Sequence, residues 1–394
     1  MTIRRVLAAA ACVLALASPA VAQDIRGFDG RRISAERIDR EAKRLMAAAR
    51  VNGLAMAVID DGKVVYANTW GWRNVEKGLP LENDTVMYGA SITKFVFAYM
   101  VMQLVDEGRL DLDKPIRDYL PKPLPDYAYY ASLKDDPRWE KLTLRMLFNH
   151  SPGFHNFGFL EPDQKLRIHF EPGSRYSYSG DGVILAQRVL EWGLGLDVEA
   201  EMKHRVWDRF GMTRTSLQWR PEWSANLADG YGADGSFEVH DERSTPRAAG
   251  SMDTTIEDLA KFYAGFMRGE GLSRRARAEM LRPQLAITTA AQFPILSEAV
   301  APEMKPYALS AGLGVITFNS RYGPGFFKGG HNDWTGNQAI CVERVGRCVI
   351  YLANDVRAES IFQRLTEATL GDPGFPWSWE GYVPYDQATA AGAR

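Results

Sequence analysis

The segment GASITKFVFAYM, residues 89–100, places Ser91 three positions before Lys94 at the start of a strongly apolar run. The run that follows is apolar nearly all round, which predicts a buried helix beginning near Ser91. A lysine is unfavourable in the first turn of a helix, because the helix dipole is positive there. A capping box would place Glu or Gln at that position. The sequence therefore places a cation where it weakens the helix.

The spacing of Ser91 and Lys94 can support nucleophilic chemistry. Residues three apart on a helix share a face, so the amine can reach the hydroxyl, which needs an adjacent base to become a good nucleophile. Burial lowers the pKa of a lysine and makes it a general base, and a helix N-terminus offers free N–H groups to an oxyanion. The alternative is that Ser91 is only an N-cap and Lys94 a surface lysine, since S-x-x-K alone is a weak motif.

Strand-like patterns lie at both ends of the chain and helical patterns lie between them. Two β-rich runs at 53–60 and 63–70, separated by Asp61 and Gly62, predict a hairpin. Helical patterns fill about residues 91–300, and within them Thr254 has capping-box spacing to Glu257. Strand-like runs return at 311–319, 337–345 and 348–355, and a final helix is predicted over 358–371.

This order predicts an α/β protein of the α+β kind, with one antiparallel sheet built from both chain ends. The sheet would occupy about residues 40–90 and 305–370, flanked by helices, with an all-helical region at about 91–300 inserted between. Two separate domains are the alternative, but no polar or Pro/Gly-rich linker marks a boundary near residue 300.

The N-terminus has the pattern of a secretory signal peptide. Arg4 and Arg5 precede a short apolar core, and the sequence AVA precedes a predicted cleavage after Ala22. The core is shorter than the ~18 apolar residues of a membrane-spanning helix. We therefore predict a signal peptide at 1–22 and a periplasmic or secreted mature chain of one catalytic domain, 23–394, without stable membrane insertion.

Composition excludes several classes of function. The chain has 47 basic and 49 acidic residues and a net charge of −2, so it has no electrostatic footprint for nucleic acid. Hydrophobic residues make up 46% of the chain, enough for a large core. Its six histidines and few cysteines show no metal-ligand spacing. We therefore expect no metal and no cofactor.

Two cysteines, Cys341 and Cys348, flank the sequence VERVGR between two apolar runs. A hairpin turning near Arg344 and Val345 would place them opposite each other. An exported protein meets an oxidising compartment, so a disulfide is one prediction. Two buried free thiols are the other.

Five blocks of this sequence, in order, resemble the serine β-lactamase and penicillin-binding-protein superfamily. The resemblance is strongest to class C β-lactamases and the related esterases and D-amino-acid peptidases, and it extends over about residues 40–370. It implies a β-lactamase/transpeptidase-like fold and a serine hydrolase activity. The blocks are 70–116, 142–154, 170–191, 248–262 and 326–337.

The resemblance assigns roles to three side chains. Ser91 and Lys94 match the nucleophile and the lysine of the family's S-x-x-K motif. Tyr178 matches the tyrosine of Y-x-N, which works with the lysine as general base. Without the resemblance, Tyr178 could equally be a core tyrosine.

The resemblance also implies a strand that faces the site. Lys328, Gly329 and Gly330 match the K-T-G or H-x-G triplet, and the backbone N–H groups of Ser91 and His331 would form the oxyanion hole. Lys328 could instead be a solvated lysine at a strand end, and His331 a structural histidine. His150 is interpreted as part of a turn and not as a base.

Two departures from the family pattern bear on the substrate. Gly180 stands where Y-x-N has asparagine, which disfavours efficient β-lactam hydrolysis. Gly329 removes the hydroxyl of K-T-G, although Lys328 still suits an anionic group. No S-D-N motif occurs, so the class A version of the fold is disfavoured.

These observations predict an exported serine hydrolase that forms an acyl-enzyme with carboxylic esters or small amides. A D-amino-acid peptidase, a D-Ala-D-Ala carboxypeptidase, a weak β-lactamase and an acyltransferase are the alternatives on the same fold. A hypothesis of another class is a non-catalytic penicillin-binding-like module that senses cell-wall fragments. The aromatic stretches 126–130 and 375–385 are interpreted as packing, and the 286–311 segment as a loop that could shape the pocket.

Overall fold

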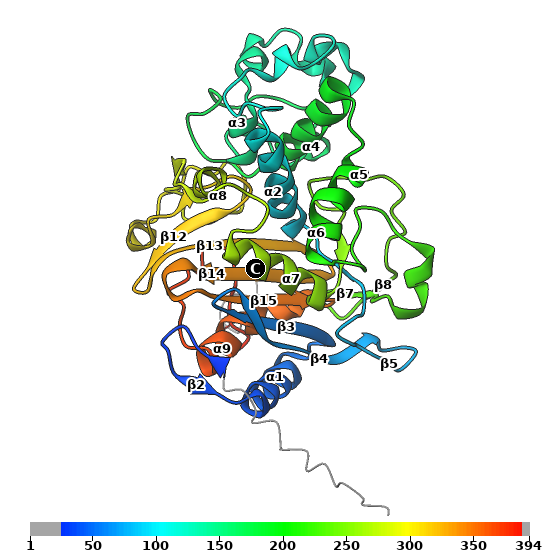
Figure 1. Ribbon diagram of the computed structural model, residues 1–394, viewed down its shortest axis with the longest axis vertical. Coiled ribbons are helices and arrows are strands. Elements are labelled where there is room, and N and C mark those ends of the chain that lie inside the picture. Colours follow the sequence, from blue (N-terminus) through cyan, green and yellow to red (C-terminus); the bar gives the residue numbers. More distant parts are fainter. Residues whose placement is uncertain (1–24, 388–394) are drawn as a thin grey trace, which may run out of the picture.

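A nine-stranded antiparallel sheet forms the centre of the protein in the computed structural model, which describes residues 25–387 (Figure 1). The strand order is β10-β11-β12-β13-β14-β15-β3-β4-β5, so strands from the two chain ends meet where β15 pairs with β3. The predicted α+β fold with one antiparallel sheet built from both chain ends is confirmed. The strands are β3 (Gly53–Asp60), β4 (Lys63–Asn74), β5 (Leu79–Pro80), β10 (Leu285–Ala286), β11 (Ser310–Ala311), β12 (Ile316–Ser320), β13 (Gly323–Asn332), β14 (Thr335–Val342) and β15 (Arg347–Ala353).

Helices cover both faces of this sheet. Helices α1 and α9 pack together on one face, and α7 packs across β3, β4 and β15 on the other (Figure 1). Helix α2 touches β13 and rises from the sheet into the helical half of the molecule. The helices are α1 (Ala35–Ala49), α2 (Ile92–Asp106), α3 (Leu144–Phe148), α4 (Gly180–Arg188), α5 (Val198–Met202), α6 (Asp208–Phe210), α7 (Ile256–Arg268), α8 (Arg274–Leu281) and α9 (Glu359–Thr369).

Strand β3 shows why the chain needs both layers of helices. All eight of its residues are buried, and successive side chains of a strand point to opposite faces. One set joins the apolar cluster that contains α2 and α7, and the other joins the cluster that contains α1 and α9. The first set is Ala55, Ala57 and Ile59, and the second is Leu54, Met56 and Val58.

Two hairpins follow the predicted turn chemistry. Asp61 and Gly62 connect β3 to β4 with φ of 47° and 69°, the left-handed conformation that a two-residue hairpin turn requires. The turn between β14 and β15 ends at Gly346 with φ of 67°. It sets Cys341 opposite Cys348, and the two sulfurs are bonded at 2.00 Å. The disulfide therefore joins two central strands.

The region 91–300 is not entirely helical, and this corrects the expectation from sequence. Strand β9 (Asp253–Thr254) pairs with β6 (Met87–Tyr88), β7 (Gly230–Tyr231) pairs with β8 (Phe237–Glu238), and β10 is the edge of the main sheet. The capping prediction was one residue early, because Thr254 belongs to the β6–β9 ladder. Thr255 caps α7 instead, its hydroxyl accepting the Asp258 N–H at 3.1 Å.

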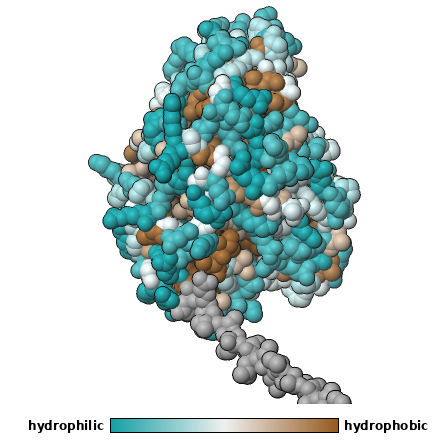
Figure 2. Space-filling view, in the orientation of Figure 1, coloured by the Kyte–Doolittle hydropathy of each residue, from teal (hydrophilic) through white to brown (hydrophobic). Residues whose placement is uncertain are grey.

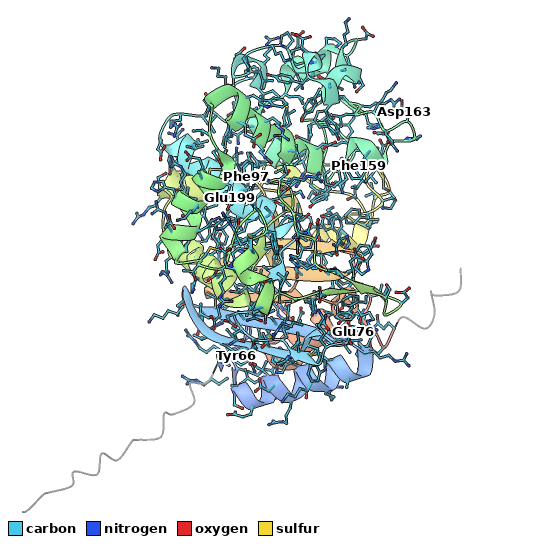
Figure 3. The ribbon with its side chains drawn as sticks, turned by 90° about the vertical axis from the view of Figure 1, so that its right-hand side faces the viewer. Tyr66, Glu76, Phe97, Phe159, Asp163 and Glu199 are labelled. Atoms are coloured by element: carbon cyan, nitrogen blue, oxygen red, sulfur yellow. A yellow bond between two sulfur atoms is a disulfide. The ribbon has the colours of Figure 1, made fainter. Side chains whose placement is uncertain are left out.

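The surface in Figure 2 is mostly hydrophilic, with small separate hydrophobic patches. Figure 3 shows Phe97 in the helical half and Tyr66 near α1, where the Tyr66 hydroxyl donates to Asp39 Oδ1 at 2.5 Å. Among residues 25–387, no helix is long and apolar enough to cross a membrane. The predicted signal peptide, residues 1–22, lies outside the described residues.

Candidate active site

A cavity of about 1000 Å³ opens where the N-terminus of α2, strand β13 and the segment before α4 meet. The predicted site residues converge there from three distant parts of the chain. Lys94 lies just beneath Ser91 and does not line the cavity itself. The predicted residues that do line it are Ser91, Tyr178, Lys328, Gly329, Gly330 and His331.

The backbone around Ser91 is held in an unusual conformation. Ala90, directly before it, has φ of 46°, a left-handed conformation that is costly for a residue with a Cβ. The Gly89 N–H donates to the Met252 carbonyl at 2.8 Å, and the Met252 N–H donates to Thr93 Oγ1 at 3.2 Å. The segment that contains Met252 therefore fixes the start of α2. Ser91 occupies the N-cap position, but its hydroxyl caps no N–H of the helix, so it is left available.

Lys94 supplies the partner of that hydroxyl. Its Nζ donates to Ser91 Oγ at 2.9 Å and to the carbonyl of Ala249, and the residue is 1% exposed. Burial lowers the pKa of Lys94 well below its usual value, and the nearby charge of Lys328 lowers it further, while Asp181 partly opposes both. The free amine is therefore favoured, and a free amine can accept the hydroxyl proton.

Tyr178 is held beside this pair by His150. The Ser177 N–H donates to the His150 carbonyl at 2.7 Å, and the Ser179 N–H donates to His150 Nδ1 at 3.2 Å. The His150 ring lies 4.6 Å from the Tyr178 ring between centroids. Burial lowers the pKa of His150. Burial thus favours the neutral form of His150, and its contacts position Tyr178.

The Tyr178 ring lies between two amines. Lys94 Nζ is 5.0 Å and Lys328 Nζ is 5.1 Å from its centroid. Lys328 also donates to the Tyr178 hydroxyl at 3.4 Å. Burial raises the pKa of Tyr178, and a hydrogen bond with Ser91 opposes that rise. Ser91, Lys94, Tyr178 and Lys328 thus form one connected cluster.

Gly330 allows strand β13 to approach the N-terminus of α2. A Cβ on Gly330 would lie 2.8 Å from the backbone nitrogens of both Ser91 and Ile92, closer than a real Cβ can stand. Any side chain there would push the strand away from the helix. Within residues 25–387, the Ser91 N–H has no hydrogen-bond partner. This N–H is available to an oxyanion in the cavity.

The side chain of His331 is paired with a carboxylate outside the Ser91–Lys94–Tyr178–Lys328 cluster. Its Nδ1 lies 3.2 Å from Glu359 Oε1, and this carboxylate raises the pKa of His331. Its ring stacks on Phe293 at 5.8 Å between centroids. His331 can therefore offer the cavity its backbone N–H without a catalytic side chain. No group of three or more His, Cys, Asp or Glu side chains among residues 25–387 is arranged to hold a metal ion.

The space beside Gly180 is filled from another loop. A Cβ on Gly180 would lie 2.4 Å from two ring carbons of Phe157, and the Gly180 N–H donates to Asn156 Oδ1 at 2.8 Å. Asn156 and Phe157 both line the cavity. The position where the family pattern has an asparagine side chain is therefore occupied by these two residues.

Two segments interpreted as packing also line the cavity, which the sequence interpretation missed. The C-terminal stretch contributes Glu380 and Tyr382, and the 126–130 stretch contributes as well. The 286–311 loop, predicted as a segment that could shape the pocket, contributes Phe293. A lone acidic residue in an aromatic run was the one local signal for Glu380. The residues that the 126–130 stretch contributes are Tyr127, Ala128, Tyr129 and Tyr130.

One wall of the cavity is formed by aromatic side chains of the helical half. Tyr127 stacks on Trp192 with centroids 3.9 Å apart, and Phe157 stacks on Phe159 at 5.0 Å. Phe159 is 56% exposed and lies in the helical half of the molecule, above the sheet in Figure 3. Exposed aromatic rings at the edge of a cavity suit an apolar ligand group.

The antiparallel sheet, the hydrogen-bonded pair of Ser91 and buried Lys94, and a tyrosine close to two lysines are the features of a serine β-lactamase-like protein. The sequence profile described as Beta-lactamase matches residues 38–370. The chain belongs to the beta-lactamase family.

Several named proteins are similar to this chain. Lovastatin esterase from Penicillium rubens is 29% identical over 46% of this chain and 53% of its own length. A β-lactamase from Pseudomonas fluorescens is 24% identical over 69% of this chain and 75% of its own. A D-aminopeptidase from Gluconobacter oxydans is 29% identical over 42% and 32%. The chain thus spans about half or less of several curated relatives that it matches.

Solved structures share the fold. The octameric penicillin-binding protein homologue from Pyrococcus abyssi superposes with a TM-score of 0.67 at 22% identity, covering 82% of this chain and 74% of the other. The D-alanine carboxypeptidase AmpC from Burkholderia cenocepacia gives 0.64 at 20% identity, covering 81% and 93%. The fold predicted from the sequence is therefore that of both proteins.

Proposed function

We propose that the protein is an exported serine hydrolase that works through an acyl-enzyme on Ser91. One observation carries the proposal: the amine of buried Lys94 lies 2.9 Å from Ser91 Oγ. The lowered pKa of Lys94 supports it, because a lower pKa favours the free amine, and a free amine can take the hydroxyl proton. A surface lysine beside a helix cap would need neither the burial nor this contact.

The proposed reaction begins when Ser91 Oγ attacks the substrate carbonyl carbon and its proton passes to Lys94 Nζ. The carbonyl oxygen becomes an oxyanion held by the N–H groups of Ser91 and His331. The C–O or C–N bond then breaks as Tyr178 gives its hydroxyl proton to the leaving group and regains one from Lys94. Water attacks the acyl-enzyme by the same route in reverse and releases the acid.

The proposed substrates are carboxylic esters or small amides with an apolar group. The aromatic wall of the cavity supports this, as does a relative named lovastatin esterase. Gly180 and the filled space beside it weigh against efficient β-lactam hydrolysis. The relative named D-aminopeptidase keeps a D-amino-acid peptidase as the second candidate.

Intact-mass spectrometry tests the proposal. The wild-type protein is mixed with p-nitrophenyl esters, D-amino-acid amides and penicillins, and both adduct mass and product are followed. We expect turnover of esters and labelling by an active-site phosphonate, both abolished in Ser91→Ala. Phosphonate labelling of the Ser91→Ala protein would refute the assignment of the nucleophile. A stable penicilloyl adduct without ester turnover would instead favour the non-catalytic sensor.

Export is proposed on the N-terminal sequence alone. Expression of the full chain with its native N-terminus in a Gram-negative host, followed by N-terminal sequencing of the periplasmic or secreted protein, tests it. We expect the mature protein to begin at Gln23. Recovery of the protein only in the cytoplasm, with residues 1–22 still attached, would contradict export.

A further inference from the structure

The C-terminal segment after α9 returns to the active site and is firmly anchored there. Phe375 packs on Phe327 of β13 with ring centroids 4.7 Å apart. The side chain of Trp379 is fully buried, and its carbonyl accepts the Gln292 N–H at 2.9 Å. Tyr382 is buried as well. The residue at 380 is therefore fixed from both sides and is not part of a loose tail.

Glu380 points into the cavity against strand β13. A Cβ on Gly329 would lie 2.6 Å from Glu380 Oε2 and 3.4 Å from the Tyr382 hydroxyl. Gln338 Nε2 donates to the same carboxylate oxygen at 3.4 Å. The carboxylate thus occupies the space into which a side chain at position 329 would project. Only a residue without a side chain at position 329 leaves room for the Glu380 carboxylate in this place.

Glu380 also supplies a negative charge to Lys328. The Lys328 amine is buried and donates to the Gly329 carbonyl at 2.6 Å and to the Tyr178 hydroxyl. Burial lowers the pKa of Lys328, and Glu380 is the charged group that opposes this. Burial raises the pKa of Glu380 to about 7, and Lys328 and then His331 oppose that rise. Above that pH the chain itself therefore provides an anion close to Lys328, where the anion of a ligand would otherwise bind.

We propose that Glu380 is a specificity-determining residue that fills the anion subsite beside Lys328 and excludes a carboxylate on the leaving group. The proposed substrates are then esters or small amides whose leaving group is uncharged or cationic where it lies beside Lys328 and Glu380. A substrate carboxylate placed there would face the Glu380 carboxylate in a water-poor cavity, where repulsion between like charges is strong. This inference rests on the proposed function and narrows its substrate class.

Three matched esters test the inference: 3-carbamoylphenyl, 3-carboxyphenyl and 3-trimethylammoniophenyl acetate. We expect the wild type to cleave the carboxy ester with a kcat/KM at least about tenfold below that of the carbamoyl ester. Glu380→Gln keeps the shape and removes the charge. Because Glu380 also acts on Lys328, the variant can shift the rates of all three esters together, so the readout is a ratio of rates. The ratio of carboxy to carbamoyl kcat/KM should rise about tenfold, and the ratio of cationic to carbamoyl kcat/KM should fall.

The matched control is Asp386→Asn. Asp386 lies on the same segment, exposed and paired with Arg364, outside the cavity lining. The Asp386→Asn substitution makes the same change in net charge as Glu380→Gln and should leave all three rates unchanged. An unchanged ratio of carboxy to carbamoyl rates in a Glu380→Gln protein that melts like wild type would overturn the inference.

Failure of the proposed function has a different signature. A wild-type protein that cleaves none of the three esters would contradict the hydrolase activity and leave the subsite to be judged by binding. In that case, calorimetric titration of the intact carboxy and carbamoyl esters into wild type and Glu380→Gln measures the binding affinity of each ester. The ratio of the carboxy affinity to the carbamoyl affinity then replaces the ratio of rates. A ratio that rises about tenfold in the variant supports the inference, whereas an unchanged ratio or absence of binding overturns it.

Discussion

The two lysines of the site lie at nearly equal distances from the Tyr178 ring, 5.0 and 5.1 Å, yet their surroundings differ. Both amines are buried and both donate to neutral acceptors: Lys94 to the Ser91 hydroxyl and the Ala249 carbonyl, Lys328 to the Tyr178 hydroxyl and the Gly329 carbonyl. Burial lowers the pKa of each lysine. The charge of Lys328 lowers the pKa of Lys94 further and Asp181 partly opposes this, whereas at Lys328 the opposing charge is Glu380. Burial alone therefore does not distinguish the two lysines, and the charges near each of them differ.

Replacing each lysine by methionine gives the largest expected effect. Lys94→Met should lower kcat/KM for an ester by about 10³- to 10⁴-fold, because it removes the proposed base. Lys328→Met should cost about 10- to 100-fold, because it removes a cation that only supports the cluster. Steady-state kinetics on both variants, with melting curves to confirm folding, measure the difference. Equal losses of kcat/KM in the two variants would contradict the assignment of Lys94 as the base and Lys328 as a supporting cation.

Tyr178→Phe should lower kcat/KM by about 10²-fold for an alkyl ester, whose leaving group needs a proton. The ring remains between the lysines, so their spacing is preserved. A p-nitrophenyl ester, whose leaving group departs as an anion, should lose much less. An equal loss on both esters would mean that Tyr178 positions the lysines and does not deliver the proton.

Gly180→Asn restores the family residue but should not restore the family activity. The new Cβ would lie 2.4 Å from the Phe157 ring, so we expect destabilisation by about 1–3 kcal/mol and no gain in penicillin hydrolysis. Gly108→Asn serves as the comparison, because nothing lies within 4 Å of a Cβ there and the variant is destabilised only by its left-handed φ of 71°, which Asn tolerates better than most residues. Urea unfolding of both variants compares them. A stable Gly180→Asn protein that hydrolyses penicillin would contradict the interpretation of this space.

The lowered pKa of Lys94 predicts a pH dependence of stability. Between that lowered value and the ordinary lysine value, the unfolded chain holds a proton on Lys94 that the folded chain lacks. Stability therefore rises with pH through this window, by at most about 1.4 kcal/mol per pH unit. Lys94→Met should lose this rise, whereas Lys134→Met, at an exposed position, should keep it. Urea unfolding between pH 7 and 9 measures both slopes, and identical slopes in wild type and Lys94→Met would contradict the prediction.

The same pKa predicts that kcat/KM for a neutral ester rises with pH as Lys94 loses its proton, and levels off below the ordinary lysine value of about 10.4. A pH–rate profile on the carbamoyl ester measures this. A rise that continues to the ordinary lysine pKa would contradict a free amine in the resting enzyme.

Parts of the molecule with local signals were predictable from sequence, and parts defined by distant contacts were not. The sheet from both chain ends followed from apolar, β-rich runs and turn residues. The candidate pair Ser91 and Lys94 followed from a lysine in an unfavourable place. Glu380 could not be placed, because its position depends on packing between the C-terminal segment and β13. Its signals in the sequence were a lone acidic residue in an aromatic run and, on β13, the absence of a side chain at Gly329.

The pairing of β15 with β3 has a consequence for how the protein is made. A ribosome completes β3 and β4 early, but the strand that covers the open edge of β3 emerges near the end of synthesis. Until then the edge of β3 that later pairs with β15 is unpaired, and an unpaired apolar strand edge promotes aggregation. The site cluster also needs Lys328 from β13 and Glu380 from the C-terminal segment. A chain interrupted before these segments would therefore be prone to aggregate and would lack two side chains of the proposed site.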